Sequence, residues 1–224
     1  MPEIHSDAFK GSGRSQVKRL PDRGKYDKDT LYQIIDEALI CQVGFIQNDQ
    51  PFVIPTIHAR INDALVFHGA PASRLLKLAA AGQPLCVSMT LVDGLVLARS
   101  VFHHSINYRS VVLFGAGRLL ETDEEKLTAL RAITEHIAPG RWDAARSPNA
   151  KELNATNVIV MPISEASAKL RTGPAVDDEA DYALPVWAGV LPLELQSQSP
   201  LPDARLLPGL EVPEYISQYR RKRE

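Results

Sequence analysis

The 224-residue sequence has few of the features that mark disulfide-stabilised or metal-binding proteins. It contains only two cysteines, Cys41 and Cys86, and both lie in apolar, strand-like runs without a Cys-x-x-Cys or Cys/His spacing nearby. We interpret them as buried thiols in a reducing compartment, not as a disulfide or a metal site. His103 and His104 are adjacent, so in a strand they would point to opposite faces and would not bind one ion together.

The sequence also lacks an excess of either charge and any long apolar run. Its formal net charge is -2, and its one dense basic cluster is Arg220-Arg221-Lys222-Arg223, which argues against a phosphate-tracking surface for nucleic acid. No run approaches the roughly 20 apolar residues that a membrane helix requires. The polar segment 1–14 has no apolar core of a secretion signal. We therefore expect a cytoplasmic protein that binds neither nucleic acid nor membrane.

The pattern of apolar residues predicts a mainly β protein with peripheral helices. Helical spacing predicts helices over 26–40, 72–81 and 123–136, the first of them capped by Asp29 or Thr30. Antiparallel strands joined by short turns favour a closed or partly closed β-barrel, because closure removes exposed strand edges. The strands are predicted over 41–47, 51–60, 63–69, 84–92, 94–101, 109–121, 156–163 and 166–171, with turns at Asn48-Asp49, Asn62-Asp63 and Asp93-Gly94.

Composition divides the chain into three parts. Residues 1–16 are rich in Gly, Ser and His and are interpreted as a flexible leader. Residues 17–173 carry the strands and helices and form the barrel domain. Residues 174–224 are Pro-rich and lose regular periodicity, so we expect an arm that lies over the barrel or over a partner subunit, followed by the basic tail.

A polar cluster, Asn107-Tyr108-Arg109-Ser110, lies where one predicted strand gives way to the next. Tyrosine stacks on flat rings, arginine pairs with phosphates or ring edges, and asparagine and serine supply hydrogen bonds. The cluster therefore suits a flat, anionic cofactor. In the alternative interpretation, Arg109 faces away from any ligand and pairs with structural carboxylates.

A second candidate lies at residues 67–74, where a predicted strand leads into a predicted helix. Free amides, the Ser73 hydroxyl and the Arg74 guanidinium would lie near one another and form a phosphate cradle. The alternative is that Ser73 only caps the helix and Arg74 points to solvent. Lys169 and Arg171 share one face of a strand by alternation, either as a solvated face or as a phosphate or substrate contact.

The run from His103 to Ser110, followed by Val111-Val112 and Gly115, resembles the flavin-nucleotide-binding proteins related to pyridoxamine 5'-phosphate oxidase, which include nitroimidazole-resistance proteins. The resemblance extends over roughly residues 17–193. The further segments that carry it are 19–24, 43–45, 51–56, 67–70, 73–74, 139–142, 169–174 and 187–192. The resemblance implies an FMN-binding split barrel that forms a homodimer with FMN at the subunit interface.

The resemblance also implies where FMN would bind. Ser73 and Arg74 would hold the phosphate, and strand 55–58 and the 107–110 cluster would hold the ring and ribityl chain. A guanidinium near the ring would raise the reduction potential of the flavin. Trp187 is either a core aromatic or a flavin contact from the arm across the dimer. The predicted flavin contacts are Pro55, Thr56, Ile57, His58, His68, Gly69, Ser73, Arg74, Asn107, Tyr108, Arg109, Ser110 and Trp187.

By this resemblance we expect an FMN-dependent oxidoreductase that reduces or oxidises a small molecule, with NADH or NADPH as electron donor. No catalytic residue is identified, because neither Tyr108 nor Arg109 titrates near neutral pH. One alternative is a flavin-binding or flavin-storing protein without turnover. Another is a haem-binding split barrel, whose axial ligand would come from His58, His68, His103 or His104.

Overall fold

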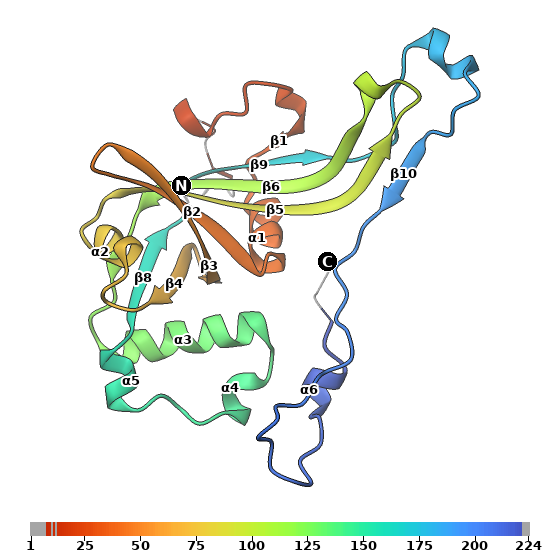
Figure 1. Ribbon diagram of the computed structural model, residues 1–224. Helices are drawn as coiled ribbons and strands as arrows, with labels where there is room; N and C mark the ends of the chain where they lie inside the picture. The colour runs from red at the N-terminus through yellow and green to blue at the C-terminus, as the bar shows by residue number, and fades with distance from the viewer. Residues whose placement is uncertain (1–7, 10, 12, 221–224) are drawn as a thin grey trace, which may run out of the picture. The chain divides into compact units, whose positions relative to one another are not determined.

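The computed structural model describes residues 8–9, 11 and 13–220 (Figure 1). The chain forms two compact units that alternate along the sequence. Unit 1 comprises residues up to 38, residues 86–114 and residues 163–194, and unit 2 comprises residues 39–85, 115–162 and those from 195 onward. None of the helices in the described ranges is both long and apolar enough to cross a membrane.

Unit 1 is built on an antiparallel sheet with strand order β1-β9-β6-β5, and β10 pairs with β5 (Figure 1). Helix α1 (Lys28–Glu37) packs on β9 through Leu31, Ile34 and Ile35. The N-cap of α1 is Asp27, whose carboxylate accepts a hydrogen bond from the Thr30 amide at 2.9 Å, so the cap lies just before the two predicted residues. The other elements of unit 1 are β1 (Gly24–Lys25), β5 (Pro84–Leu97), β6 (Ser105–Ala116), β9 (Glu165–Arg171), β10 (Gly189–Pro192), η1 (Gly13–Ser15), η2 (Pro21–Arg23), η3 (Val101–His103) and η4 (Glu179–Ala183).

Unit 2 contains a second antiparallel group of strands in the order β2-β3-β4-β8-β7. The turns predicted at Asn48-Asp49 and Asn62-Asp63 are confirmed. Asn48, Asp49 and Asn62 all have positive φ angles, which tight hairpin turns require. The elements of unit 2 are β2 (Ile40–Gln47), β3 (Gln50–Ile61), β4 (Ala64–Gly69), β7 (Arg118–Leu119), β8 (Asn157–Pro162), α2 (Arg74–Ala80), α3 (Asp123–Ile137), α4 (Arg141–Ala144), α5 (Ala150–Asn154) and α6 (Glu214–Ser217).

The core of unit 2 lies between α3 and the strands. Helix α3 packs on β3, β4 and β8, and α2 packs on β7 and β8. A capping box fixes the start of α3, where the Thr122 hydroxyl accepts from the Glu125 amide and the Glu125 carboxylate accepts from the Thr122 amide. The buried apolar side chains under α3 are Ala59, Val66, Leu120, Ala129, Ile133 and Val158. The prediction of a mainly antiparallel β protein with peripheral helices is therefore confirmed.

The predicted turn at Asp93-Gly94 is wrong. Residues 84–97 form one continuous strand, β5, and β10 pairs with it across Gly94. A Cβ atom at position 94 would lie 3.0 Å from the Leu191 carbonyl oxygen, so the glycine permits the close approach of β10. The boundary predicted near 107–110 is wrong as well, since these residues lie inside β6.

Most of the predicted leader lies outside the described residues. In its described part, Phe9 and Ser15 are buried. Arg14 forms an ion pair with Glu165 at 3.0 Å, and its guanidinium lies over the Phe114 ring at 4.6 Å from the centroid. The described end of the leader therefore packs on unit 1. Of the predicted basic tail, only Arg220 is described.

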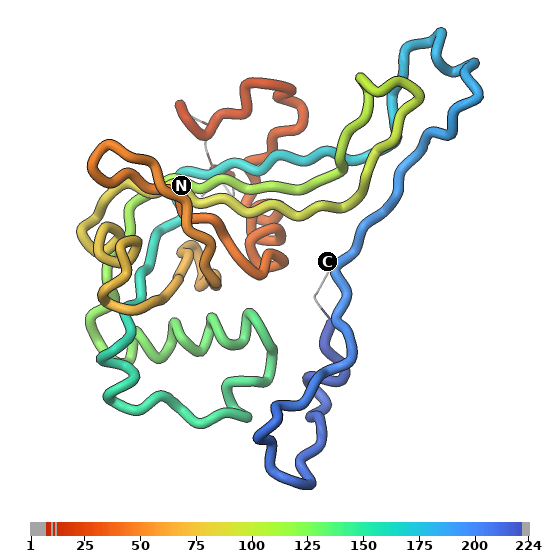
Figure 2. Tube along the Cα trace, in the orientation of Figure 1, coloured from red at the N-terminus to blue at the C-terminus, as the bar shows by residue number. Residues whose placement is uncertain are grey.

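The predicted arm begins beside the β5–β6 hairpin of unit 1. Figure 2 traces residues 174–188 alongside the tip of this hairpin. The Asp177 carboxylate accepts hydrogen bonds from the backbone amides of Arg99 at 2.9 Å and Ser100 at 3.2 Å, and from the Arg99 guanidinium at 3.2 Å. Burial alone would raise the pKa of Asp177, but these hydrogen bonds from Ser100 and Arg99 lower it overall. Asp177 therefore ties the arm to the hairpin.

Both cysteines are free thiols, as predicted. Cys41 is fully buried, and burial raises its pKa to about 12. Cys86 is only partly buried, and burial raises its pKa as well. The described residues contain no group of three His, Cys, Asp or Glu side chains able to hold a metal ion.

Candidate functional site

The predicted site residues fall into two groups, one in each unit. Residues 55–58, 68–69 and 73–74 belong to unit 2, and residues 107–110 and Trp187 belong to unit 1. Within unit 2, strand β4 ends at Gly69 and helix α2 begins at Arg74, so the predicted passage from strand to helix is confirmed. A Cβ atom at Gly69 would lie 3.0 Å from the Leu76 side chain, so the glycine lets the strand end approach the helix closely.

In the described part of the chain, the side chains of the two residues of the predicted phosphate cradle form neither a helix cap nor an ion pair. The Ser73 side chain makes no capping hydrogen bond to α2. The Arg74 guanidinium is exposed and lies over the Phe52 ring, 4.4 Å from its centroid. Within the described part of the chain, Arg74 forms no ion pair. An aromatic face that supports a guanidinium without neutralising it leaves the charge available to an anion.

Strand β3 offers backbone groups next to this cradle. Residues 50–57 pair with β2 on one edge, whereas pairing with β4 begins only at His58. Among the described strands, the second edge of β3 is thus unpaired along Pro55, Thr56 and Ile57. Unpaired strand amides and carbonyls can bond the polar edge of a flat ring.

Two histidines of unit 2 are buried to different degrees. His58 is fully buried, and its ring centroid lies 4.9 Å from that of His136 on α3. His68 is half-buried on β4, and its Nδ1 atom is buried without a hydrogen-bond partner in the described part of the chain. Burial lowers the pKa of His68, so its imidazole is neutral at physiological pH.

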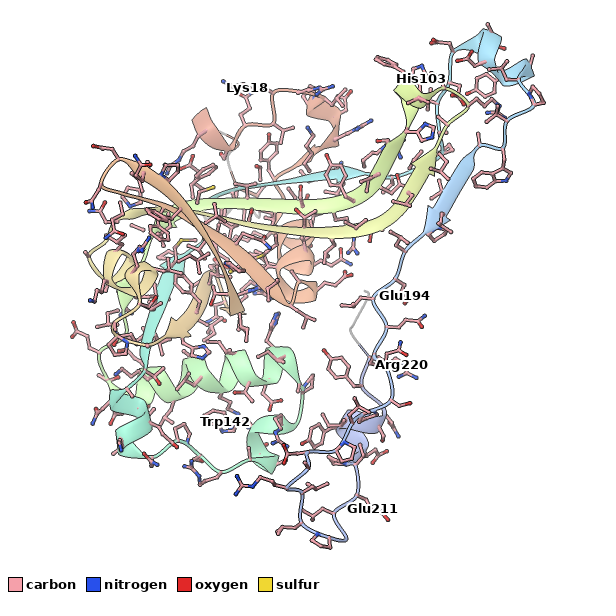
Figure 3. The ribbon with its side chains drawn as sticks, viewed as in Figure 1. Lys18, His103, Trp142, Glu194, Glu211 and Arg220 are labelled. Carbon is pink, nitrogen blue, oxygen red and sulfur yellow. The ribbon has the colours of Figure 1, made fainter. Side chains whose placement is uncertain are left out.

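Two histidines, His103 at the end of η3 and His104 directly after it, have nearby partners, and Figure 3 shows His103 at the tip of the β5–β6 hairpin. His103 lies 3.5 Å from the Asp178 carboxylate, and its ring packs edge-on against the exposed Phe102. His104 Nδ1 is hydrogen-bonded to the Ser100 carbonyl at 2.9 Å. Both side chains therefore have local partners in unit 1.

In unit 1, Arg109 pairs with carboxylates, as in the alternative interpretation. Its guanidinium donates to both oxygens of Glu37, the Nη2 bond measuring 2.8 Å, and to both oxygens of Asp93, at 2.8 and 3.0 Å. The hydrogen bonds that Arg109 donates to Glu37, and then those that it donates to Asp93, raise the pKa of Arg109. One guanidinium and two carboxylates carry a net charge of -1. The effect of Arg109 on a flavin potential stays a prediction, and its pairing with two carboxylates argues against it.

The neighbours of Arg109 bond mainly within the sheet. Buried Asn107 donates to the Gly173 carbonyl at 3.1 Å, and its side-chain oxygen accepts a hydrogen bond from Arg171. Ser110 donates to the Lys169 carbonyl at 3.2 Å. These contacts pin the end of β9 to β6, and they assign to Asn107 and Ser110 a structural role that the sequence interpretation missed.

Trp187 is 68% exposed, so it is not a core aromatic. Its ring lies against Gly189 at the start of β10, where a Cβ atom would come within 2.9 Å of the ring. An exposed tryptophan held against its own strand remains available to a ligand or to a partner. The flavin contact predicted for Trp187 stays a prediction.

Sequence reasoning missed three charged residues of these regions, namely Glu37, Asp93 and Asp177. Glu37 ends α1, Asp93 lies within β5, and Asp177 lies in the predicted arm. Each pairs with an arginine that is distant in the sequence. No local motif marks such pairs, and only Asp93 stood out, as a charge within an apolar run.

Residues 27–170 match the model of a protein family that is described as pyridoxamine 5'-phosphate oxidase. A comparison with curated proteins returned no match. Among solved structures, the chain is similar to the flavocytochrome Anf3 from Azotobacter vinelandii, with 42% identity, a TM-score of 0.88, and coverage of 94% of this chain and 98% of that one.

Two further solved structures are similar. The FAD and heme binding protein from Mycobacterium smegmatis shares 34% identity at a TM-score of 0.83, covering 87% of this chain and 96% of that one. A putative 5-nitroimidazole antibiotic resistance protein from Bacteroides thetaiotaomicron shares 24% identity at a TM-score of 0.55, covering 64% of this chain and 83% of that one, and this likeness concerns the fold alone.

Proposed function

The chain belongs to the pyridoxamine 5'-phosphate oxidase family, and on that premise we propose that it is a redox protein that binds both a flavin and haem. Its fold is the split barrel of this family, as predicted. The observation that carries the proposal is the similarity, over nearly the whole chain, to two proteins whose names specify a flavocytochrome and an FAD and haem binder. The proposal therefore replaces FMN alone by a flavin, expected to be FAD, together with haem.

The uncommitted groups of unit 2 support flavin binding. Ser73 and Arg74 would hold a flavin phosphate, because the hydroxyl caps nothing and the guanidinium has no carboxylate partner in the described chain. The unpaired edge of β3 along Pro55, Thr56 and Ile57 would bond the polar edge of the ring. When bound, the flavin would supply the electron-transfer chemistry, and these residues would orient it.

The histidines of unit 2 support haem binding. A haem iron takes a neutral imidazole as axial ligand. Burial keeps His68 neutral, and its Nδ1 atom has no hydrogen bond in the described chain that a ligand would have to break. We propose His68 as the axial ligand, ahead of the fully buried His58. His103 and His104 are engaged at the hairpin tip and are the weaker candidates.

The protein as purified tests the proposal. We expect flavin absorption together with a Soret band, and release of FAD on denaturation, identified by chromatography. Arg74→Ala should weaken flavin binding by about 1.5–3 kcal/mol, the usual strength of a charge-assisted hydrogen bond. Lys77→Ala is the matched control, because Lys77 is an exposed cation on the same helix. Equal affinity of the two variants would remove Arg74 from the site.

The haem assignment needs its own variant. His68→Ala should abolish or shift the Soret band while retaining flavin, and His104→Ala is the control because its Nδ1 is bonded to a carbonyl of the same hairpin. A colourless protein that takes up neither flavin nor haem would refute the proposed function. Flavin without haem would reduce it to a flavin-binding protein.

We also propose a homodimer that accepts electrons from NADH or NADPH. Exposed apolar side chains of the predicted arm support the dimer, because monomers seldom leave so many uncovered. They include Leu195, Leu201, Leu207 and Leu210, which are 72%, 92%, 70% and 56% exposed. Light scattering tests the dimer, and anaerobic titration with each nucleotide tests the donor.

A further inference from the structure

Arg171, at the end of β9 in unit 1, is a buried cation without a carboxylate partner in the described part of the chain. It is 8% exposed. Its guanidinium donates only to neutral oxygens: the Asn107 side chain, the Gly173 carbonyl at 3.2 Å and the Pro174 carbonyl at 3.1 Å. A buried charge is costly unless it is paired, because it loses its hydration. In the described part of the chain, only neutral oxygens therefore compensate this buried charge.

Two further cations of unit 1 lie beside Arg171. Lys169 precedes it by two residues and so shares its face of β9. The Lys169 ammonium donates to the Arg19 carbonyl at 3.0 Å, which is again a neutral oxygen. Arg23 belongs to η2, which contacts β9. Burial lowers the pKa of Arg171, and the nearby charge of Arg23 lowers it further. Repulsion among cations in a folded protein points to an anion that binds between them.

An aromatic side chain adjoins these cations. Tyr108 on β6 lies opposite Arg171 in the strand register and is half-buried. As a register partner, Tyr108 lies on the same face of the sheet as Arg171, and Lys169 lies on that face too. A half-exposed ring next to a cationic group suits a ligand that combines an anion with a flat base. Figure 3 labels Lys18 on the N-terminal segment that carries η2.

We propose that Arg171, Lys169 and Arg23 bind the phosphate of an adenine nucleotide whose base stacks on Tyr108. The phosphate of adenosine 5'-monophosphate carries nearly two negative charges, and the diphosphate bridge of a dinucleotide carries two, so either compensates the clustered cations better than a single carboxylate does. Two sources present this chemistry, the adenylate half of FAD and the adenylate half of a nicotinamide dinucleotide. The site goes beyond the proposed function, because it uses neither the Ser73-Arg74 cradle nor the histidines of unit 2.

Calorimetric titration of the full chain with adenosine 5'-monophosphate tests the proposal, with adenosine as the comparison. Lys169→Gln and Arg23→Gln should each weaken nucleotide binding about tenfold or more. Both residues are half-buried and have no carboxylate partner in the described chain, so both variants should fold. Lys25→Gln is the matched control, because Lys25 lies opposite Ala168 and hence on the other face of the same strand pair. The control should bind within twofold of the parent.

A second variant separates the base from the phosphate. Tyr108→Leu should weaken binding of the nucleotide but leave binding of inorganic phosphate unchanged. If the nucleotide binds only after the flavin has been removed, the site is assigned to the adenylate of the flavin. If it binds to both the flavin-loaded and the flavin-free protein, the site is assigned to a nicotinamide dinucleotide. Equal affinity for nucleotide and adenosine would overturn the proposal. So would Lys169→Gln and Arg23→Gln variants that bind the nucleotide as tightly as the Lys25→Gln control. Flavin and Soret absorption are measured separately, so failure of the proposed function would be distinguishable.

Discussion

Removal of Arg109 should destabilise the protein far more than removal of an exposed arginine. The Arg109 side chain is 17% exposed, and its two partners, Glu37 and Asp93, are 9% and 23% exposed. Arg109→Gln leaves two largely buried carboxylates close together without their cation. Breaking a buried ion pair from one side costs about 3–5 kcal/mol, because the remaining charge stays buried and unpaired. For a chain of this size that loss lowers the melting temperature by roughly 6–20 °C.

The matched control is Arg131→Gln. Arg131 pairs with Asp143 at 3.4 Å, but their side chains are 57% and 75% exposed. Exposed pairs contribute about 0–1 kcal/mol, since water solvates both charges well. Thermal and urea unfolding followed by circular dichroism should therefore separate the two variants by at least 2 kcal/mol, as a rough minimum. Equal losses would refute the assignment of Arg109 to a buried cluster.

The pH dependence of the Arg109 variant gives an independent test. Without the guanidinium, two largely buried carboxylates are left close together, so the folded variant should take up a proton that relieves their repulsion. The folded variant would then bind more protons than its unfolded state, so its stability should fall as pH rises. We expect the deficit against the parent to shrink between pH 7 and pH 5. A deficit that does not change with pH would show that these carboxylates remain solvated.

Local sequence patterns predicted the elements whose geometry is set by near neighbours. The helix over 123–136 was predicted within one residue, because its apolar residues recur at helical spacing. The structure adds a capping box at its start. The turn at Asn48-Asp49 was predicted because these residues tolerate positive φ angles. The prediction of β4 followed by α2 placed Ser73 and Arg74 correctly at a strand-to-helix passage.

Patterns that depend on distant chain segments were not predictable in this way. Asp93-Gly94 has the composition of a hairpin turn, yet Gly94 is needed where β10 approaches, about 97 residues further along the chain. Asp93 itself is fixed by Arg109. The same limit holds for the site, because the sequence showed a cationic, aromatic cluster at 107–110 but not which carboxylates would neutralise Arg109.

Two predictions follow from the environments of single side chains. Cys41 should react with a thiol reagent at pH 8 only after unfolding, because the thiolate is the reactive form and burial raises the pKa of Cys41 to about 12. Cys86 is only partly buried, so it should react slowly in the native protein. Mass spectrometry of the labelled peptides checks this, and early labelling of Cys41 would contradict it. Asp177→Asn should lower the melting temperature at neutral pH. The folded-state pKa of Asp177 is lowered, so its carboxylate stabilises the fold at pH values above the unfolded pKa of about 4. That contribution is lost as pH falls through the folded pKa, so the difference in melting temperature between parent and variant should shrink on acidification. A difference that persists at pH 3 would mean that Asp177 holds the arm to the hairpin by its shape and not by its charge.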